Sequence, residues 1–439
     1  MTFPRFEPSA VARALGYLPE GPGEFADGYF ETLTETRLGE DGYAARSRAE
    51  EGFSLRLTSS GSTYVATRDS CSEADFRSAY RQVARTLPNT PLVWREREGR
   101  EVGGFEEGGL SEELTSAPRR LRRRLGERGF GLRYRATFLR HHREVLVAAS
   151  EFCGRVQRET FYSVELELPG GFWGTLLPSL GEGVTESLAD LAAEFARYAE
   201  CRPAVVPPTT VVLGPQAAAV FLHEAVAHTL EVDTLAASGD PRAALGMALA
   251  SPALTVFDDP ETAPHAVRRT SDDEGMPVVR RCLLRRGAVE QLIADRFWAE
   301  KVDGLIPGAG RRADRSYLPG PRSYHLEVMP GEESPQRLLS SVAEGIYVPL
   351  FVKGQLDSVR GTCRLDAPGA LQIQNGEISG RLGRCRFQAP AADLLGAVAE
   401  VASDAQVTGA GWCAKSDQRL PVWATTPTLL LDAVSARPW

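Results

Sequence analysis

Alternation of apolar and polar side chains dominates the start of the chain and predicts strands. Residues 29–67 show this alternation, most clearly at 53–57, and a Ser-Ser-Gly turn separates two short strands. Apolar residues then recur at helical spacing after Ser72, which stands three positions before Asp75, as a helix cap does. This stretch therefore predicts a strand-rich unit that ends in a helix.

The pattern changes several times before the middle of the chain. Residues 95–113 are rich in glycine and charge without periodicity, which is typical of a linker. A basic helix near 114–126, strands within 130–176 and a helix over about 185–200 follow. Prolines between 203 and 208 then interrupt the pattern and indicate a domain boundary.

The two parts of the chain predict an α+β fold, because strands and helices are segregated rather than alternating. We expect an N-terminal α+β domain over residues 1–208, with sub-units at 20–95 and 112–205. A strand-rich C-terminal domain over residues 209–439 follows, and it opens with a short strand and a helix. Within it, Asn375-Gly376 predicts a two-residue hairpin.

Composition excludes some classes of protein. The 439 residues carry a net charge of −8, which argues against a nucleic-acid partner. No apolar run approaches the ~20 residues of a membrane helix, and the first residues lack the apolar core of a signal peptide. We therefore expect a cytoplasmic protein. Three of the 50 basic residues are lysines, Lys301, Lys353 and Lys415, and this arginine bias indicates a GC-rich genome.

The segment FLHEAVAHTLE, residues 221–231, carries the most informative chemistry. It places two histidines, His223 and His228, five positions apart on one predicted helix. On a regular α-helix their rings point ~140° apart, so a shared metal ion requires a π-type bulge or a broken turn. Without one, Glu224, His228 and Glu231 share a face and form a rival ligand set. A third interpretation is an amphipathic helix with locally hydrogen-bonded polar groups.

Several motifs in a fixed order resemble the TldD/PmbA family of metalloproteases, once called modulators of DNA gyrase. The metal-bearing branch of that family carries HExxGHxLE, similar to residues 223–231, and CGKxGQxxPV, similar to 413–422. Its DDEGxP, GRR, PR and EGIY elements are similar to residues 272–277, 310–312, 321–322 and 344–347. The resemblance covers nearly the whole chain.

The resemblance implies a metal site and an activity. The implied ligands are His223, His228 and Cys413, holding one zinc ion per subunit, with iron as the alternative metal. Glu224 is the implied general base. The implied activity is cleavage of unfolded or modified peptides in an enclosed chamber. The implied assembly is a dimer, either of two copies or with a related metal-less subunit.

The chain departs from the family where Gly-rich segments are usual. Residues 423–426 replace a GxGxP run, residues 351–354 replace a second Gly-rich run, and His325 stands where asparagine is expected. Glycine allows close backbone approach, so these departures affect the peptide cleft more than the metal. The alternatives are therefore a metal-dependent tailoring enzyme acting on an amide or other C–N bond, or a non-catalytic, chamber-forming peptide-binding subunit.

Further polar residues are candidates for supporting the metal ligands or binding substrate. These are Glu231, Arg311, Arg312, Arg322 and His325. The arginines are candidates because a guanidinium group can hold a carboxylate through two parallel hydrogen bonds.

Three other clusters are expected at the surface. The acidic run 272–274 is interpreted as an Asx turn with solvated carboxylates. His141-His142 is interpreted as an exposed pair, and the arginines of 119–124 as a solvated helix face.

Overall fold

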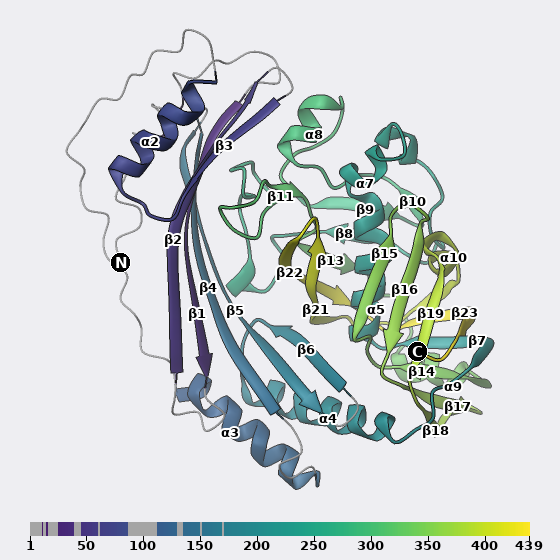
Figure 1. The fold of residues 1–439 in the computed structure, drawn as a ribbon. Helices are drawn as coiled ribbons and strands as arrows, with labels where there is room; N and C mark the ends of the chain where they lie inside the picture. The colour runs from purple at the N-terminus through teal and green to yellow at the C-terminus, as the bar shows by residue number, and fades with distance from the viewer. Residues whose placement is uncertain are drawn as a thin grey trace.

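The computed structural model has an α+β fold, as expected, with two strand-rich parts side by side (Figure 1). It describes Val11, Leu15 and residues 25–38, 45–59, 62–86, 112–129, 135–149, 152–168 and 171–439. All but two residues of the expected linker 95–113 lie outside the described residues. Among the helices that the structure describes, none combines the length and apolar character needed to cross a membrane.

An antiparallel six-stranded sheet of order β3-β2-β1-β4-β5-β6 forms the N-terminal part. Its strands are β1 Phe25–Leu38, β2 Ala45–Ser59, β3 Ser62–Arg68, β4 Arg135–Ala149, β5 Phe152–Leu168 and β6 Gly171–Leu177. The expectation of short strands over 29–67 is wrong, since β1 and β2 have 14 and 15 residues. Residues 25–31 and 52–59 are buried on both faces of the sheet, and beyond them both strands continue as a ribbon with exposed side chains.

Helices α2, α3 and α4 cover one face of this sheet. α2 Glu73–Ala84 packs on Phe53 and Phe30, and its predicted cap is confirmed, because Ser72 Oγ accepts from the Asp75 amide at 3.1 Å. α3 Glu112–Glu127 and α4 Glu182–Ala199 cover the same face at its other end. The arginines of α3 divide: those at 119, 122 and 123 are exposed, whereas those at 120 and 124 contact α4 or the residues before it.

The C-terminal part is built from three main sheets. The first has order β10-β9-β8-β13-β22-β21, the second β18-β17-β14-β7-β23-β20, and the third β15-β16-β19. Their strands are β7 Val206–Leu213, β8 Val256–Asp258, β9 Arg281–Arg285, β10 Ala288–Val289, β13 His325–Val328, β14 Glu344–Val348, β15 Lys353–Asp357, β16 Thr362–Ala367, β17 Ala370–Gln374, β18 Glu377–Leu382, β19 Cys385–Pro390, β20 Val398–Val401, β21 Gln406–Lys415, β22 Gln418–Thr426 and β23 Leu429–Ala436.

Short elements complete this part. They are the ribbon β11 Gly310–Arg311 and β12 Gly320–Pro321 and the helices α5 Pro215–Leu222, α6 His228–Leu230, α7 Val232–Ala236, α8 Arg296–Lys301, α9 Pro335–Ser341 and α10 Ala391–Gly396. The predicted Asn375-Gly376 hairpin joins β17 to β18, with φ of 52° and 77° at the two positions. Strand β7 begins at Val206, so the prolines at 207 and 208 lie inside it rather than ending an element.

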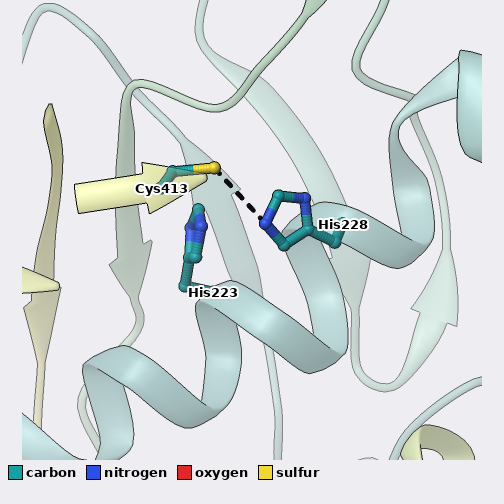
Figure 2. Close-up of side chains that lie close together, drawn as sticks. All are labelled: His223, His228 and Cys413. Carbon is teal, nitrogen blue, oxygen red and sulfur yellow. Dashed lines mark hydrogen bonds between the residues drawn. The ribbon is translucent and has the colours of Figure 1, made fainter. Parts of the chain in front are cut away.

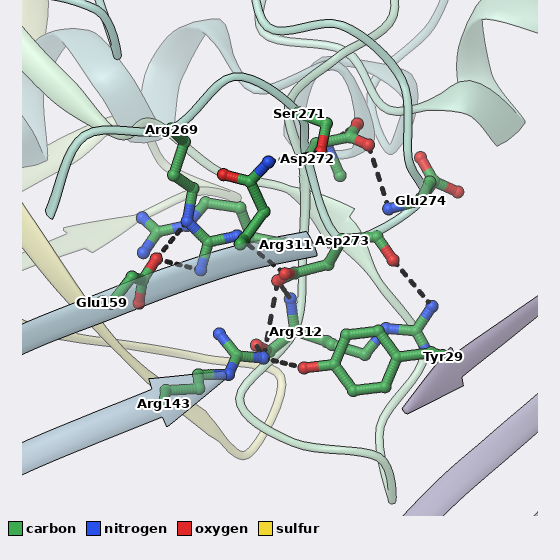
Figure 3. Close-up of polar contacts among 12 residues, drawn as sticks. Tyr29, Arg143, Glu159, Arg269, Ser271, Asp272, Asp273, Glu274, Arg311 and Arg312 are labelled. Atoms are coloured by element: carbon green, nitrogen blue, oxygen red, sulfur yellow. Dashed lines mark hydrogen bonds and ion pairs between the residues drawn. The ribbon is translucent and has the colours of Figure 1, made fainter. Parts of the chain in front are cut away.

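Buried charges join the inner face of the N-terminal sheet to the C-terminal part (Figure 3). Arg143 on β4 donates to the backbone oxygen of Arg312 at 3.0 Å, and Arg312 donates to Ser54 Oγ on β2 at 3.0 Å. Glu159 on β5 pairs with Arg269. These hydrogen bonds and ion pairs hold the two parts in one relative position. Separating the parts would leave buried charges without partners, which costs free energy.

The acidic run 272–274 lies in this seam, which corrects the expectation of solvated carboxylates. All three side chains are fully buried. Asp272 Oδ1 accepts from the Glu274 amide at 2.9 Å, as in an Asx turn, and its Oδ2 accepts from the Gly310 amide at 3.0 Å. Burial alone would raise the pKa of Asp273, but the guanidinium groups of Arg269, at 2.7 Å, and Arg143 together with the Arg312 amide outweigh it and lower that pKa. The carboxylates are therefore structural partners of the seam.

Candidate metal centre

A local change of helix type brings the two histidines to one side of their helix. α5 starts with Pro215 in its first turn and carries alanines at 217–219, all fully buried, so the helix runs through the core. Residues His223–Ala227 form a π-helix, and α6 follows. The predicted distortion between the histidines is confirmed. The wider turn compensates for the extra residue in HExxxH, which a regular helix cannot do.

Three buried side chains meet beside this turn (Figure 2). His223 and His228 have ring centroids 4.6 Å apart, and Cys413 Sγ lies 3.4 Å from His228 Nε2. One ligand atom from each residue lies within 4.8 Å of the other two, and the described residues contain no other such group of three. Cys413 comes from β21, whose pairing with β22 holds it there.

The donor set fits a zinc ion. Two imidazole nitrogens and a thiolate are common zinc ligands, and three protein ligands leave a fourth position open, as in catalytic sites. His223 Nε2 is buried, and no hydrogen-bond partner for it is found among the described residues. A metal ion would satisfy this nitrogen.

A buried carboxylate orients His228. The Nδ1–H of His228 donates to Glu231 Oε2 at 2.8 Å, which turns Nε2 toward Cys413. Glu231 also accepts from Lys415 Nζ at 2.7 Å, and Lys415 donates to Asp233 at 2.7 Å as well. Burial would raise the pKa of Glu231, but His228 and Lys415 outweigh it and lower that pKa well below its usual range. An ionised Glu231 therefore holds the imidazole in place, as carboxylates beside metal-binding histidines do.

These contacts disfavour the rival ligand set of Glu224, His228 and Glu231. Glu231 is engaged by His228 Nδ1 and Lys415, on the side of the ring away from Cys413. Glu224 instead lines the cavity described next, where burial raises its pKa. It lies against Gly354 of β15, where an added Cβ would come within 2.5 Å of Glu224 Cγ.

The metal cavity has a volume of about 460 Å³ and is walled by His223, Glu224, His228 and Cys413 on one side. Three strands at the edges of their sheets, β6, β15 and β21, supply other parts of its wall. Residues 351–354, where the chain departs from the family, also line it. Lys353 in this run is exposed and has no ion-pair partner among the described residues.

The remaining candidates do not line this cavity. Arg311 donates to the backbone oxygens of Ser323 and Pro421 at 2.6 and 2.8 Å. Arg322 donates to the backbone oxygen of Lys415 at 3.1 Å. These buried arginines, like Arg312 in the seam, hold the surrounding backbone in place.

His325 and the pair at 141–142 are also placed by the structure. His325 is fully buried, and its Nε2 is hydrogen-bonded with Thr425 Oγ1 at 2.9 Å. The interpretation of His141-His142 as exposed is wrong. His141 stacks at 4.7 Å on Phe161, its direct neighbour on β5, and Trp412 of β21 contacts it edge-on at 5.3 Å.

Sequence reasoning missed Lys415 as the partner of Glu231, although Lys415 lies in the segment similar to CGKxGQxxPV. It also missed Trp412 and Arg419, which line the cavity. No pattern in the sequence marks these two residues.

Comparison with known proteins places the chain in a family. Residues 208–437 match the family model described as the PmbA/TldA metallopeptidase C-terminal domain. The chain belongs to the TldD/PmbA family. It is 30% identical over 256 residues to a metalloprotease TldD homolog of Haemophilus influenzae, covering 58% of this chain and 52% of that protein.

Other relatives bear similar names. A metalloprotease of Methanocaldococcus jannaschii is 28% identical over 55% of this chain and 54% of its own length. A protein of Saccharolobus solfataricus named zinc metalloprotease TldD homolog is 22% identical over 48% of this chain and 47% of its own length. The chain thus aligns with about half the length of these curated relatives, which is narrower than the expected match over nearly the whole chain.

Solved structures share the fold over nearly the full length. TldE from Thermococcus kodakarensis superposes with a TM-score of 0.73 at 18% identity, covering 97% of this chain and 98% of the other. A putative modulator of a DNA gyrase from Thermotoga maritima gives 0.70 at 16% identity, covering 94% and 96%. At such identities the likeness concerns the fold, including the N-terminal part that the family model leaves out.

Proposed function

We propose that this chain is a zinc-dependent peptidase in which His223, His228 and Cys413 hold the metal and Glu224 is the general base. The convergence of three buried ligand atoms within 4.8 Å beside a cavity that Glu224 lines carries this proposal. The names of the relatives support a metallopeptidase. A zinc ion would supply Lewis acidity to the scissile carbonyl and to the attacking water.

The residues of the chain would perform the remaining steps. Glu224 takes a proton from the attacking water and passes it to the leaving nitrogen. Burial raises the pKa of Glu224, which makes its carboxylate a stronger base than one in water. The terminal strands around the cavity would offer backbone groups to an extended peptide, so recognition would not depend on every side chain.

Substitution of Glu224 by glutamine tests the proposal. The amide has nearly the same shape but accepts no proton at neutral pH, so turnover of an unstructured peptide falls by about 10²–10⁴-fold. Zinc content, measured by elemental analysis, stays at the wild-type value. Glu377→Gln on β18 changes the same chemical group away from the cavity and serves as the control. Near-normal turnover in Glu224→Gln would show that Glu224 is not the general base. Loss of zinc from this variant would indicate that Glu224 binds the metal.

One observation favours a second candidate. Residues 351–354, which replace a Gly-rich run of the family, lie in the wall of the metal cavity. A changed wall favours a specialised substrate, so the second candidate is a metal-dependent enzyme that acts on an amide or other C–N bond in biosynthesis. A protein that binds zinc but cleaves no unfolded peptide, alone or with a partner subunit, would favour it.

We also propose a dimeric assembly with the metal facing a shared interior. Enclosure between subunits keeps folded proteins away from a peptidase site. The partner is either a second copy of this chain or a related metal-less subunit.

A further inference from the structure

A second cavity of about 240 Å³ adjoins the metal cavity. It lies between the inner face of the N-terminal sheet and the β21–β22 hairpin, and Trp412 and Arg419 line both cavities. On β5, Glu159 and Phe161 line the second cavity, and the next two residues on the same face of the strand line the metal cavity. One continuous strand face therefore runs from one cavity into the other.

Aromatic rings form much of the wall of this second cavity. His141 and Phe161 stack at 4.7 Å, and Trp412 meets them edge-on at 5.3 and 5.7 Å. Burial lowers the pKa of His141 to about 4, so its imidazole is uncharged at neutral pH. A hydrogen bond of 2.8 Å between His141 Nε2 and Ser163 Oγ fixes the ring. An aromatic side chain bound here could make with these rings the offset-stacked and edge-on contacts that aromatic pairs prefer.

The charges around this cavity balance. Its lining includes three carboxylates and three guanidinium groups, namely Glu35, Glu50, Glu159, Arg48, Arg143 and Arg419. A bound side chain that is positively or negatively charged would therefore be attracted by three of these groups and repelled by three. The volume lies below the ~300–1,000 Å³ of small-molecule sites, which suits a single side chain. An uncharged aromatic side chain fits both observations.

We infer that this cavity is a subsite for an aromatic side chain of the peptide substrate, an inference that rests on the proposed peptidase function. Arg419 lies over the Trp412 ring at 5.4 Å and has no carboxylate partner among the described residues. It can therefore also cover the face of a bound ring. The strand face from Phe161 to Glu165 spans about 13 Å, the length of about four residues of an extended peptide, so one peptide can reach both cavities.

A peptide series tests the subsite. Unstructured peptides of alanine, glycine and serine carry one phenylalanine that is moved along the sequence, and kcat/KM is measured for each against the all-small parent. Wild-type protein should favour one position by about tenfold, the upper range for an aromatic pair. Trp412→Ala should reduce the ratio of kcat/KM values at this position to about one, and Trp412→Phe should keep most of the wild-type ratio. Trp439→Ala removes a tryptophan that lines neither cavity and should keep the preference.

Binding of the same fluorescently labelled peptides to the Glu224→Gln protein separates the subsite from the peptidase function. Preferred binding of the phenylalanine peptide without cleavage by the wild type would support the subsite and overturn the peptidase. Cleavage with no preferred position, or a preference that Trp412→Ala leaves intact, would overturn the subsite and leave the peptidase standing. Absence of both cleavage and binding would overturn both.

Discussion

Glutamine in place of Glu231 should weaken zinc binding without changing the three proposed ligands. The Glu231 carboxylate is fully buried and accepts from His228 Nδ1 at 2.8 Å and from Lys415 Nζ at 2.7 Å. The amide oxygen of glutamine can still accept from His228, so the orientation of the ring is kept. The negative charge that balances Lys415 and makes the imidazole more basic is lost.

The size of the effect follows from these contacts. Partners that orient metal-binding histidines contribute about 10–100-fold in affinity. That range corresponds to about 1.4–2.7 kcal/mol. Because water does not reach Glu231, its charge is poorly screened, and we expect a loss near the upper end of the range.

Competition with a chromophoric chelator gives the zinc affinity of each variant at neutral pH. Asp233→Asn is the matched control, because it removes the other carboxylate partner of Lys415 and leaves the Glu231–His228 bond intact. The side chain of Asp233 is 28% exposed, so we expect less than about a fivefold loss there. Thermal unfolding of the metal-free proteins checks that both variants fold. Unchanged affinity in Glu231→Gln, or an equal loss in both variants, would refute the role of Glu231.

Two further predictions concern the base and the assembly. Gly354→Ala should lower turnover at least about tenfold with zinc content unchanged, because the new Cβ would lie 2.5 Å from Glu224 Cγ and displace the base. Gly396→Ala, which meets no atom within 4 Å, is its control, and equal turnover in the two variants would contradict this reasoning. Light scattering should give a dimer of 47.7 kDa subunits. A fully active monomer would contradict the shared interior, and activity that appears only with a metal-less relative would indicate a heterodimer.

Local signals in the sequence predicted individual elements well. The cap at Ser72 and the hairpin at Asn375-Gly376 depend on neighbouring residues alone, and both are confirmed. The length of β1 and the burial of residues 272–274 could not be predicted in this way. Their polar side chains are buried against charges from the other part of the chain, and a periodicity analysis treats such side chains as exposed.

In the candidate site, too, features that depend on neighbouring residues could be predicted, whereas those that depend on distant residues could not. The five-residue spacing of His223 and His228 predicted a distorted helix by geometry alone. Cys413 lies 185 residues beyond His228 in the sequence, and only the resemblance to the TldD/PmbA family pointed to it. His141 was misjudged because its neighbours in the sequence are charged, whereas its neighbours in space are aromatic.

The scarcity of lysine leaves few side chains at which an amine-reactive reagent can label the protein. Of the three lysines in the sequence, Lys353 and Lys415 line the metal cavity. Lys415 is held by two carboxylates, and Lys301 on α8 lies over the Phe297 ring at 4.0 Å. Lys353 is the exposed lysine of the cavity wall. Lys301 is exposed as well, so a Lys301→Arg variant would confine an amine-reactive fluorophore on exposed lysines to that wall, where its emission would report when the cavity fills.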